Sequence, residues 1–272
     1  RPISEPTHAD SSEDALGASL SVKGRVDVEY MSKLTGRSGE EVVKELGGRL
    51  YKNPMTGQQE TDEEYLSGNV REKLAVAEEA ARTNKEYARN VEALRQIQPV
   101  DMTENEIKPH IGAPWIDEKI YDDFIRDMVN GYGYRVHYNK RLGIWKIESN
   151  RHSSNDSNKN YYEYGTFKVP FLELLEMTLN MKTPTVRYKV QEGNKERYVV
   201  DEEATEAARA KQELIQEEFA KWLWQDAARK EELLKIYNKK YNSTVERRYD
   251  GSHLMMPGLA SEINLYPHQK DA

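Results

Sequence analysis

Two stretches of the sequence interleave basic and aromatic residues, a combination that suits nucleic-acid binding. The first covers residues 134–151 and holds a single acid, Glu148, together with the rings of Tyr134, Tyr138 and Trp145. Its basic residues are Arg135, Lys140, Arg141, Lys146 and Arg151. Basic groups release counterions from a phosphate backbone, and rings stack on exposed bases. We therefore expect this stretch to contact DNA, and an ordinary solvated basic face is the alternative.

The second stretch covers residues 229–248, where seven basic residues stand against three acids, with Tyr237 and Tyr241 among them and Tyr249 just after. Arg229 and Lys230 open it. The residues that we take as DNA-binding candidates are Lys235, Lys239, Lys240, Arg247 and Arg248. The same two interpretations, phosphate contact or a solvated lysine face, apply here.

Residue patterns typical of catalysis are absent from the sequence. There is no phosphate-binding G-x-x-x-x-G-K-S/T, no G-x-G-x-x-G and no G-x-S-x-G. The chain has no cysteine, and its six histidines do not have metal-ligand spacing. Acidic pairs such as Glu63–Glu64 and Glu202–Glu203 lie where helices are expected to start, which suits the helix dipole. We expect no catalytic residue, no metal and no cofactor in this chain.

Composition limits the class of protein further. The 272 residues are 37% hydrophobic and 32% charged, with a net charge of −7, which disfavours a nucleic-acid binder that uses its whole surface but allows local basic patches. No run of eighteen apolar residues and no signal peptide are present. These features predict a globular protein of the cytoplasm with no membrane partner. Arg1 in place of an initiator Met leads us to expect a segment of a longer polypeptide.

The N-terminal region has the pattern of a helix-turn-helix. Residues 1–15 read as a disordered lead-in, and structure is expected to start near Leu16. Within residues 16–60, Asp27 caps a helix that ends at Gly36, Ser38 starts a second helix, and a turn at residues 53–57 allows a wing. The second helix carries Glu40, Glu41 and Glu45 against Lys44. Because these acids repel phosphate, we expect this helix to pack or to contact protein rather than read DNA.

Residues 61–130 are predicted to be mostly helical. Three capping boxes support this: Thr61 with Glu64, Thr83 with Glu86, and Thr103 with Glu106. A further helix begins after Asp117 and places Ile120, Phe124 and Met128 on its inner face.

Residues 131–262 are predicted to be an α+β region with two hairpins and long helices. Residues 134–138 pair with 144–148, and residues 185–190 pair with 196–200. Residues 149–160 read as a polar surface loop, residues 171–179 as a short apolar helix, and a long helix capped by Asp201 breaks near Gln225 and Asp226. The expected fold class is α+β, rich in helices.

The C-terminal stretch YDGSHLMMPGLASEINLYPHQKDA, residues 249–272, resembles the entry to the motor of Snf-type helicase-like ATPases. These motors occur with adenine-specific DNA methylases in very large polypeptides of phages and mobile elements, including DarB-like anti-restriction proteins. In that family Leu-x-Pro-His-Gln is the Q motif, whose Gln pairs with the adenine edge. The resemblance implies that residues 263–272 begin a truncated Q motif, with Tyr266, His268 and Gln269 as nucleotide-binding residues.

Several upstream stretches are similar to the same family and follow in the same order. They are YLSGNVREKL (65–74), YARNVEALRQIQP (87–99), IGAPWI (111–116), YGTFKVPFLELLEMTLN (164–180) and FAKWLWQD (219–226). The resemblance implies a non-catalytic accessory region that contacts DNA and docks on the adjoining ATPase and methylase domains. ATP and Mg²⁺ would serve the motor of the parent protein. A structural or protein-interaction scaffold without DNA binding is the alternative.

Overall fold

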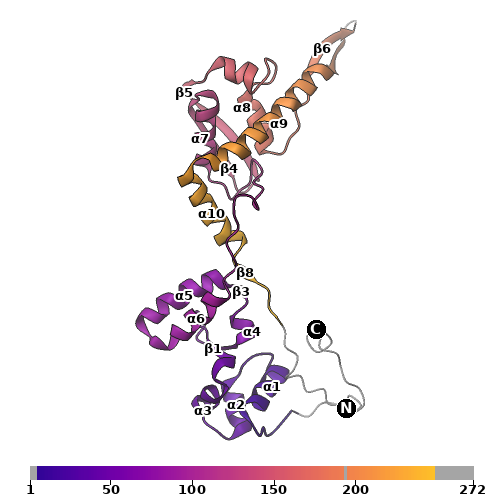
Figure 1. Ribbon diagram of the computed structural model, residues 1–272. Coiled ribbons are helices and arrows are strands. Elements are labelled where there is room, and N and C mark those ends of the chain that lie inside the picture. The colour runs from indigo at the N-terminus through magenta and orange to yellow at the C-terminus, as the bar shows by residue number, and fades with distance from the viewer. Residues whose placement is uncertain (1–4, 193–194, 249–272) are drawn as a thin grey trace. The chain divides into compact units, whose positions relative to one another are not determined.

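The computed structural model describes residues 5–192 and 195–248 (Figure 1). The described residues fall into two compact units. Unit one comprises the described residues within Arg1–Asp101 and Lys239–Ala272, and unit two comprises those within Met102–Asn238. The chain therefore leaves unit one after Asp101, forms unit two, and re-enters unit one at Lys239. The five segments expected from the sequence stay a prediction.

Unit one begins with three helices and a wing hairpin. They are α1 (Ser12–Lys23), α2 (Val28–Thr35), α3 (Gly39–Leu46) and, after the 3-10 turn η1 (Gly47–Arg49), the antiparallel strands β1 (Leu50–Lys52) and β2 (Gln59–Thr61). Each helix buries its apolar side in a shared core. This core is centred on Leu16, Met31, Leu34, Val42 and Leu46. The predicted helix-turn-helix and its wing are both present.

Helix caps explain these boundaries. Asp27 accepts a hydrogen bond from the Tyr30 N–H at 3.0 Å, and Ser38 forms a capping box with Glu41. Gly36 ends α2 with a left-handed φ of 68°, which a glycine adopts without steric cost. The caps predicted at these three positions are confirmed. α1, however, begins at Ser12 rather than near Leu16, because Ser11 caps it by accepting from the Asp14 N–H.

The rest of unit one is helical. It comprises α4 (Asp62–Tyr65), α5 (Val70–Thr83), η2 (Lys85–Tyr87), α6 (Ala88–Gln96) and the short strands β3 (Gly68–Asn69) and β8 (Thr244–Val245), which pair with each other. The capping box predicted at Thr83 is wrong. Thr83 is the last residue of α5, and Asn84 caps the next turn instead by accepting from the Glu86 N–H.

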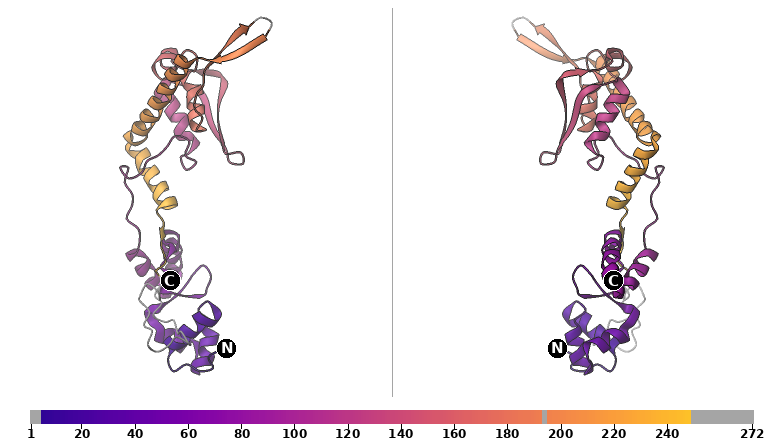
Figure 2. Two further views of the ribbon diagram at one scale, coloured as in Figure 1. Left: turned by 90° about the vertical axis from the view of Figure 1, so that its right-hand side faces the viewer. Right: turned by 90° about the vertical axis from the view of Figure 1, so that its left-hand side faces the viewer.

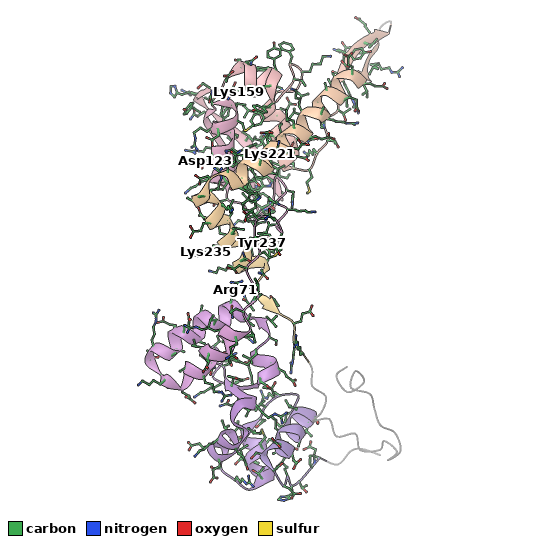
Figure 3. The ribbon with its side chains drawn as sticks, viewed as in Figure 1. Arg71, Asp123, Lys159, Lys221, Lys235 and Tyr237 are labelled. Carbon is green, nitrogen blue, oxygen red and sulfur yellow. The ribbon has the colours of Figure 1, made fainter. Side chains whose placement is uncertain are left out.

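Arg71 ties three segments of unit one together (Figure 3). Its guanidinium donates to the Asn242 carbonyl at 2.8 Å and to the Pro99 carbonyl at 3.1 Å, and it forms an ion pair with Asp101. The segment that leaves unit one and the segment that returns to it are therefore held by one side chain.

Unit two contains the remaining elements. They are α7 (Glu118–Val129), β4 (Tyr132–Asn139), β5 (Ile144–Ser154), the π-turn η3 (Lys159–Glu163), α8 (Phe171–Leu179), β6 (Arg187–Glu192), β7 (Lys195–Val200), α9 (Glu202–Gln225) and α10 (Ala227–Tyr241), whose last residues belong to unit one. The strands form two separate antiparallel hairpins, β4–β5 and β6–β7. The predicted helix-rich α+β class is confirmed, as is the helix break after Gln225.

Two predictions fail in unit two. The sequence predicts a loop from residue 149, but β5 runs on to Ser154. It does so because an irregularity in the register between Tyr132 and Tyr134 lets Tyr132 pair with Ser154. The Glu106 carboxylate accepts from the Thr103 N–H at 2.8 Å, which is one of the two bonds of a capping box, and from the Thr103 hydroxyl at 2.9 Å, but no helix follows. Pro109 accounts for this, since a proline disfavours helical backbone at the residue before it.

An aromatic cluster fills the core of unit two. The Phe124 ring lies 5.1 Å from that of Phe219 and 5.2 Å from that of Trp222, and Tyr121 stacks on Phe219 at 5.4 Å. Trp145 joins edge-on to Tyr121 at 5.0 Å. α7, α9 and the β4–β5 hairpin therefore share one core, which burial of this apolar area stabilises.

Candidate nucleic-acid interface

The β4–β5 hairpin separates its rings from its charges. Tyr138 pairs with Trp145, and Arg135 pairs with Glu148. Because directly paired residues share a face and successive residues alternate, Tyr134, Tyr138 and Trp145 face inward. Trp145 is buried, and its indole N–H donates to the Gly112 carbonyl at 3.0 Å. The expectation that these rings stack on bases is therefore wrong, since they belong to the core.

Carboxylates of α7 and α8 close both outer edges of this hairpin. Asp122 accepts from the Val136 N–H at 2.7 Å, and Glu118 from the Tyr138 N–H at 2.7 Å. On the other edge, Glu176 accepts from the Ile147 N–H at 2.8 Å. Unpaired strand edges invite pairing with other chains, so these bonds both protect the edges and fix the hairpin in place.

The same carboxylates hold two of the predicted DNA-binding residues. Arg135 forms an ion pair with Asp122 at 2.9 Å, and Lys146 forms one with Glu176 at 2.8 Å. The Glu176 carboxylate raises the pKa of Lys146, so this ammonium stays protonated at neutral pH. Both basic groups remain exposed at their ends, but each has a nearby negative charge.

Three predicted residues of this stretch carry no such countercharge. Lys140 and Arg141 lie in the exposed turn between β4 and β5, next to Leu142, which is 63% exposed, and Arg151 lies farther along β5. Within residues 5–192 and 195–248, none of the three basic groups forms an ion pair. Asn139 orders the turn by accepting from the Arg141 and Leu142 N–H groups at 3.1 Å. The tip of the hairpin is thus an ordered, basic surface.

The second basic stretch begins with two residues that stabilise the fold. The Arg229 guanidinium lies 3.6 Å from the centre of the Trp222 ring and donates to the Leu223 carbonyl. Burial lowers the pKa of Arg229. Lys230 forms an ion pair with Glu104. Both residues are only partly exposed, and each basic group has a partner within the fold.

The five DNA-binding candidates of this stretch are exposed. Lys235 lies on α10 within unit two, and Lys239, Lys240, Arg247 and Arg248 belong to unit one. Tyr237, beside Lys235 in Figure 3, packs edge-on against the Trp115 ring at 5.2 Å, so it is part of the packing. Tyr241 is exposed, with the Lys240 ammonium 5.4 Å from its ring centre. Tyr266, His268 and Gln269 lie outside the described residues.

The exposed side of α3 is acidic. Glu45 forms an ion pair with Arg37 and accepts a hydrogen bond from the buried Ser12 hydroxyl. A hydrogen bond from Ser12 and a second one from Arg37 lower the pKa of Glu45, and hydrogen bonds from Ser38 lower the pKa of Glu41. Both groups are therefore ionised at neutral pH. Their negative charge repels a phosphate backbone at α3, the second helix of the helix-turn-helix.

The wing is fixed to the helices that follow it in unit one. Arg89 donates to the Leu50 carbonyl at 3.0 Å and lies 4.3 Å from the Tyr51 ring centre, and Asn90 donates to the Lys52 carbonyl at 2.9 Å. Tyr51 in turn stacks on Tyr65 at 5.2 Å. At the wing tip, Met55 is 56% exposed. The sequence did not indicate this attachment, because its partners lie far apart along the chain.

Sequence reasoning paired β6 with β7 but did not treat that hairpin as a candidate site. Its exposed residues include Arg187, Tyr188, Lys189, Arg197 and Tyr198. The signal was present as the alternation of basic and aromatic residues in RYKV and ERYVV. Across the described ranges there is no group of acidic or histidine side chains that could hold a metal, and no helix long and apolar enough to span a membrane.

Comparisons with known proteins match two parts of the chain. Residues 8–65 match a family model described as "Probable helicase, winged helix domain". Residues 110–243 match one described as "Domain of unknown function (DUF8437)". No curated protein and no solved structure matches the chain. The three helices, the wing and the first match together show that the chain starts with a helicase-associated winged-helix region.

Proposed function

We propose that this chain is a non-catalytic accessory region of a large DNA helicase or translocase, which contacts DNA and docks on the adjoining ATPase motor. The similarity of residues 8–65 to the winged-helix domain of probable helicases carries the proposal. The winged-helix fold of these residues supports it.

The basic tip of the β4–β5 hairpin supports contact with DNA. Lys140 and Arg141 project from a turn whose backbone Asn139 holds in place. The backbone of an ordered turn loses little conformational entropy when it binds, so less of the free energy gained by counterion release is offset. The exposed basic groups of Lys239, Lys240, Arg247 and Arg248 offer a second contact in unit one.

The acidic side of α3 supports docking on protein. Glu41 and Glu45 are ionised and exposed at the position where a DNA-reading winged helix needs basic or neutral groups. We propose that this helix meets a basic surface of the motor. Such complementary charges steer association and exclude like-charged partners.

The finer assignment rests on the resemblance of the sequence to Snf-type motors. We propose that the parent is a cytoplasmic protein of a phage or mobile element in which such a motor accompanies an adenine-specific DNA methylase. ATP and Mg²⁺ would act in that motor, with Gln269 contacting the adenine. A lone adenine-contacting Gln supplies no phosphate chemistry, so this chain alone should not hydrolyse ATP.

The competing proposal is a scaffold that binds protein but no DNA, and the acidic α3 favours it. Binding of a labelled duplex at low salt distinguishes the two. We expect charge reversal at Lys239, Lys240, Arg247 and Arg248 to weaken duplex binding by about tenfold or more, because it removes up to four phosphate contacts. Reversal of Arg82 and Lys85, exposed on the helical part of unit one, is the control. If the wild-type chain shows no binding at low salt, the scaffold is correct.

A further inference from the structure

The β6–β7 hairpin is exposed on both faces. It is a two-stranded sheet of its own, and Figures 1 and 2 show it reaching out from the start of α9. Tyr188 is 50% exposed and Tyr198 is 66% exposed, and Val190 and Val200 are also exposed. Isolated two-stranded hairpins are marginally stable in water.

The base of this hairpin is nevertheless firmly anchored in unit two. The Thr205 hydroxyl accepts from the buried Val186 N–H at 2.9 Å, and the Asp201 N–H donates to the Val186 carbonyl at 2.9 Å. Asp201 also caps α9 and forms an ion pair with Lys168, which lowers the pKa of its carboxyl group. The hairpin therefore projects from a fixed point rather than from a flexible loop.

The strand register places one tyrosine on each face. Tyr188 pairs with Val199, whereas Tyr198 pairs with Lys189. Directly paired residues share a face and neighbours along a strand alternate, so the two rings point to opposite faces. By the same rule, Arg197 lies on the Tyr188 face, and Arg187 lies on the Tyr198 face. Each face thus combines one ring with one guanidinium group.

The charge of the β6–β7 hairpin favours a polyanion as its binding partner. In the part of the chain that the structure describes, Arg187 and Arg197 form no ion pair, and Lys189 pairs with Glu196 at 2.6 Å. These exposed basic groups stand on a chain whose net charge is −7. Basic residues on strand edges oppose the addition of another protein strand. The rings are divided between two faces, so they form no single apolar patch for a protein.

We propose that the β6–β7 hairpin binds a forked DNA end by entering between its two separated strands. One strand lies on each face, with an exposed base stacked on Tyr188 or Tyr198 and a phosphate at Arg197 or Arg187. Stacking needs unpaired bases, which a fork offers on both sides and an intact duplex does not. This inference rests on the proposed DNA contact and adds the DNA structure that is recognised.

The test compares a forked duplex with a blunt duplex of the same length, using the whole chain and fluorescence anisotropy. We expect the wild type to prefer the fork by about tenfold or more, because stacking contributes to affinity at each ring. Y188A/Y198A should abolish that preference and leave binding of the blunt duplex unchanged. Y188F/Y198F should retain the preference, since phenylalanine also stacks. Circular dichroism checks that the variants fold, as exposed residues should allow.

Two exposed rings elsewhere in unit two provide the matched control. Tyr162 is 63% exposed and Phe167 is 77% exposed, both outside the hairpin. Y162A/F167A should keep the fork preference. The inference is overturned if the wild type binds fork and blunt duplex equally well, or if Y188A/Y198A keeps the fork preference. In both cases the proposed DNA contact itself is retained. If no probe binds even at low salt, the proposed DNA contact fails as well.

Discussion

At the scale of single residues, Asn180 satisfies the backbone of a buried tryptophan. Its amide accepts from the Trp145 N–H and donates to the Trp145 carbonyl, both at 2.9 Å. We expect Asn180→Ala to lower the free energy of unfolding by about 3 kcal/mol, because two buried backbone groups lose their partner. Urea unfolding measures the change. Asn158→Ala, at an exposed position, is the control, and an unchanged midpoint in Asn180→Ala would show that the bonds contribute nothing.

The carboxylates of α3 give unit one a pH dependence. Hydrogen bonds lower the folded-state pKa of Glu45 and of Glu41. Such a group stabilises the fold above its unfolded pKa of about 4.3 and loses that contribution as the pH falls through the folded pKa. We expect the thermal midpoint to drop as the pH falls below about 4.3, and to drop less in Glu45→Gln. Melting curves with the same pH dependence in both proteins would contradict this.

Residues that act on near neighbours in the sequence were predictable. Asp27, Ser38, Asp117 and Asp201 were all predicted as caps, and each side chain accepts from an N–H in the first turn of its helix. Asn180 and Arg89 were not predictable, because each bonds to a residue more than thirty positions away. A side chain that bonds over such a distance leaves no local pattern to read.

At the scale of elements, the acids beside the β4–β5 hairpin should tune its affinity for DNA. Asp122→Asn keeps an oxygen for the Val136 N–H and removes the countercharge of Arg135. We expect duplex affinity to rise about threefold, the size of an exposed ion pair. Asp123→Asn, on the same helix (Figure 3) but paired with Arg126, is the matched control. If the two variants bind alike, Arg135 is not part of the interface.

Elements with strong periodicity were predicted well, and those without it were not. α7 has apolar residues at helical spacing, and it buries Phe124 and Met128 as expected. The second half of β5 has the sequence pattern of a loop, because both of its faces are largely exposed and polar and show no alternation. The sequence of the β4–β5 hairpin favours stacking of its rings on bases, because sequence alone does not tell which face of a hairpin is buried.

At the scale of the whole molecule, unit two has a core of its own. Every residue of its aromatic and aliphatic cluster, from Ile111 to Leu233, lies within Met102–Asn238. We expect residues 102–238, expressed alone, to fold cooperatively, because no buried apolar group of this cluster loses a partner. Urea unfolding with coincident tryptophan fluorescence and circular dichroism tests this. Non-coincident transitions, or strong binding of a hydrophobic dye, would show that unit two depends on unit one.

The division of the chain into two units was beyond the sequence. Unit one is discontinuous, and the chain returns to it at Lys239, inside helix α10, so no break in the helical pattern marks that boundary. The helicase-associated character was accessible, because the winged-helix pattern is local and the resemblance to helicase-like proteins rests on short stretches.

The salt dependence of duplex binding tests the central claim, that this region contacts DNA, most directly. The logarithm of the affinity should fall linearly with the logarithm of salt concentration, and K140E/R141E should reduce the slope by about 2, since each contacted phosphate contributes about 0.9. The control K221E/R209E reverses two exposed basic residues of α9 and should keep the wild-type slope. A wild-type affinity that does not change with salt, or equal slopes in all three proteins, would contradict the account.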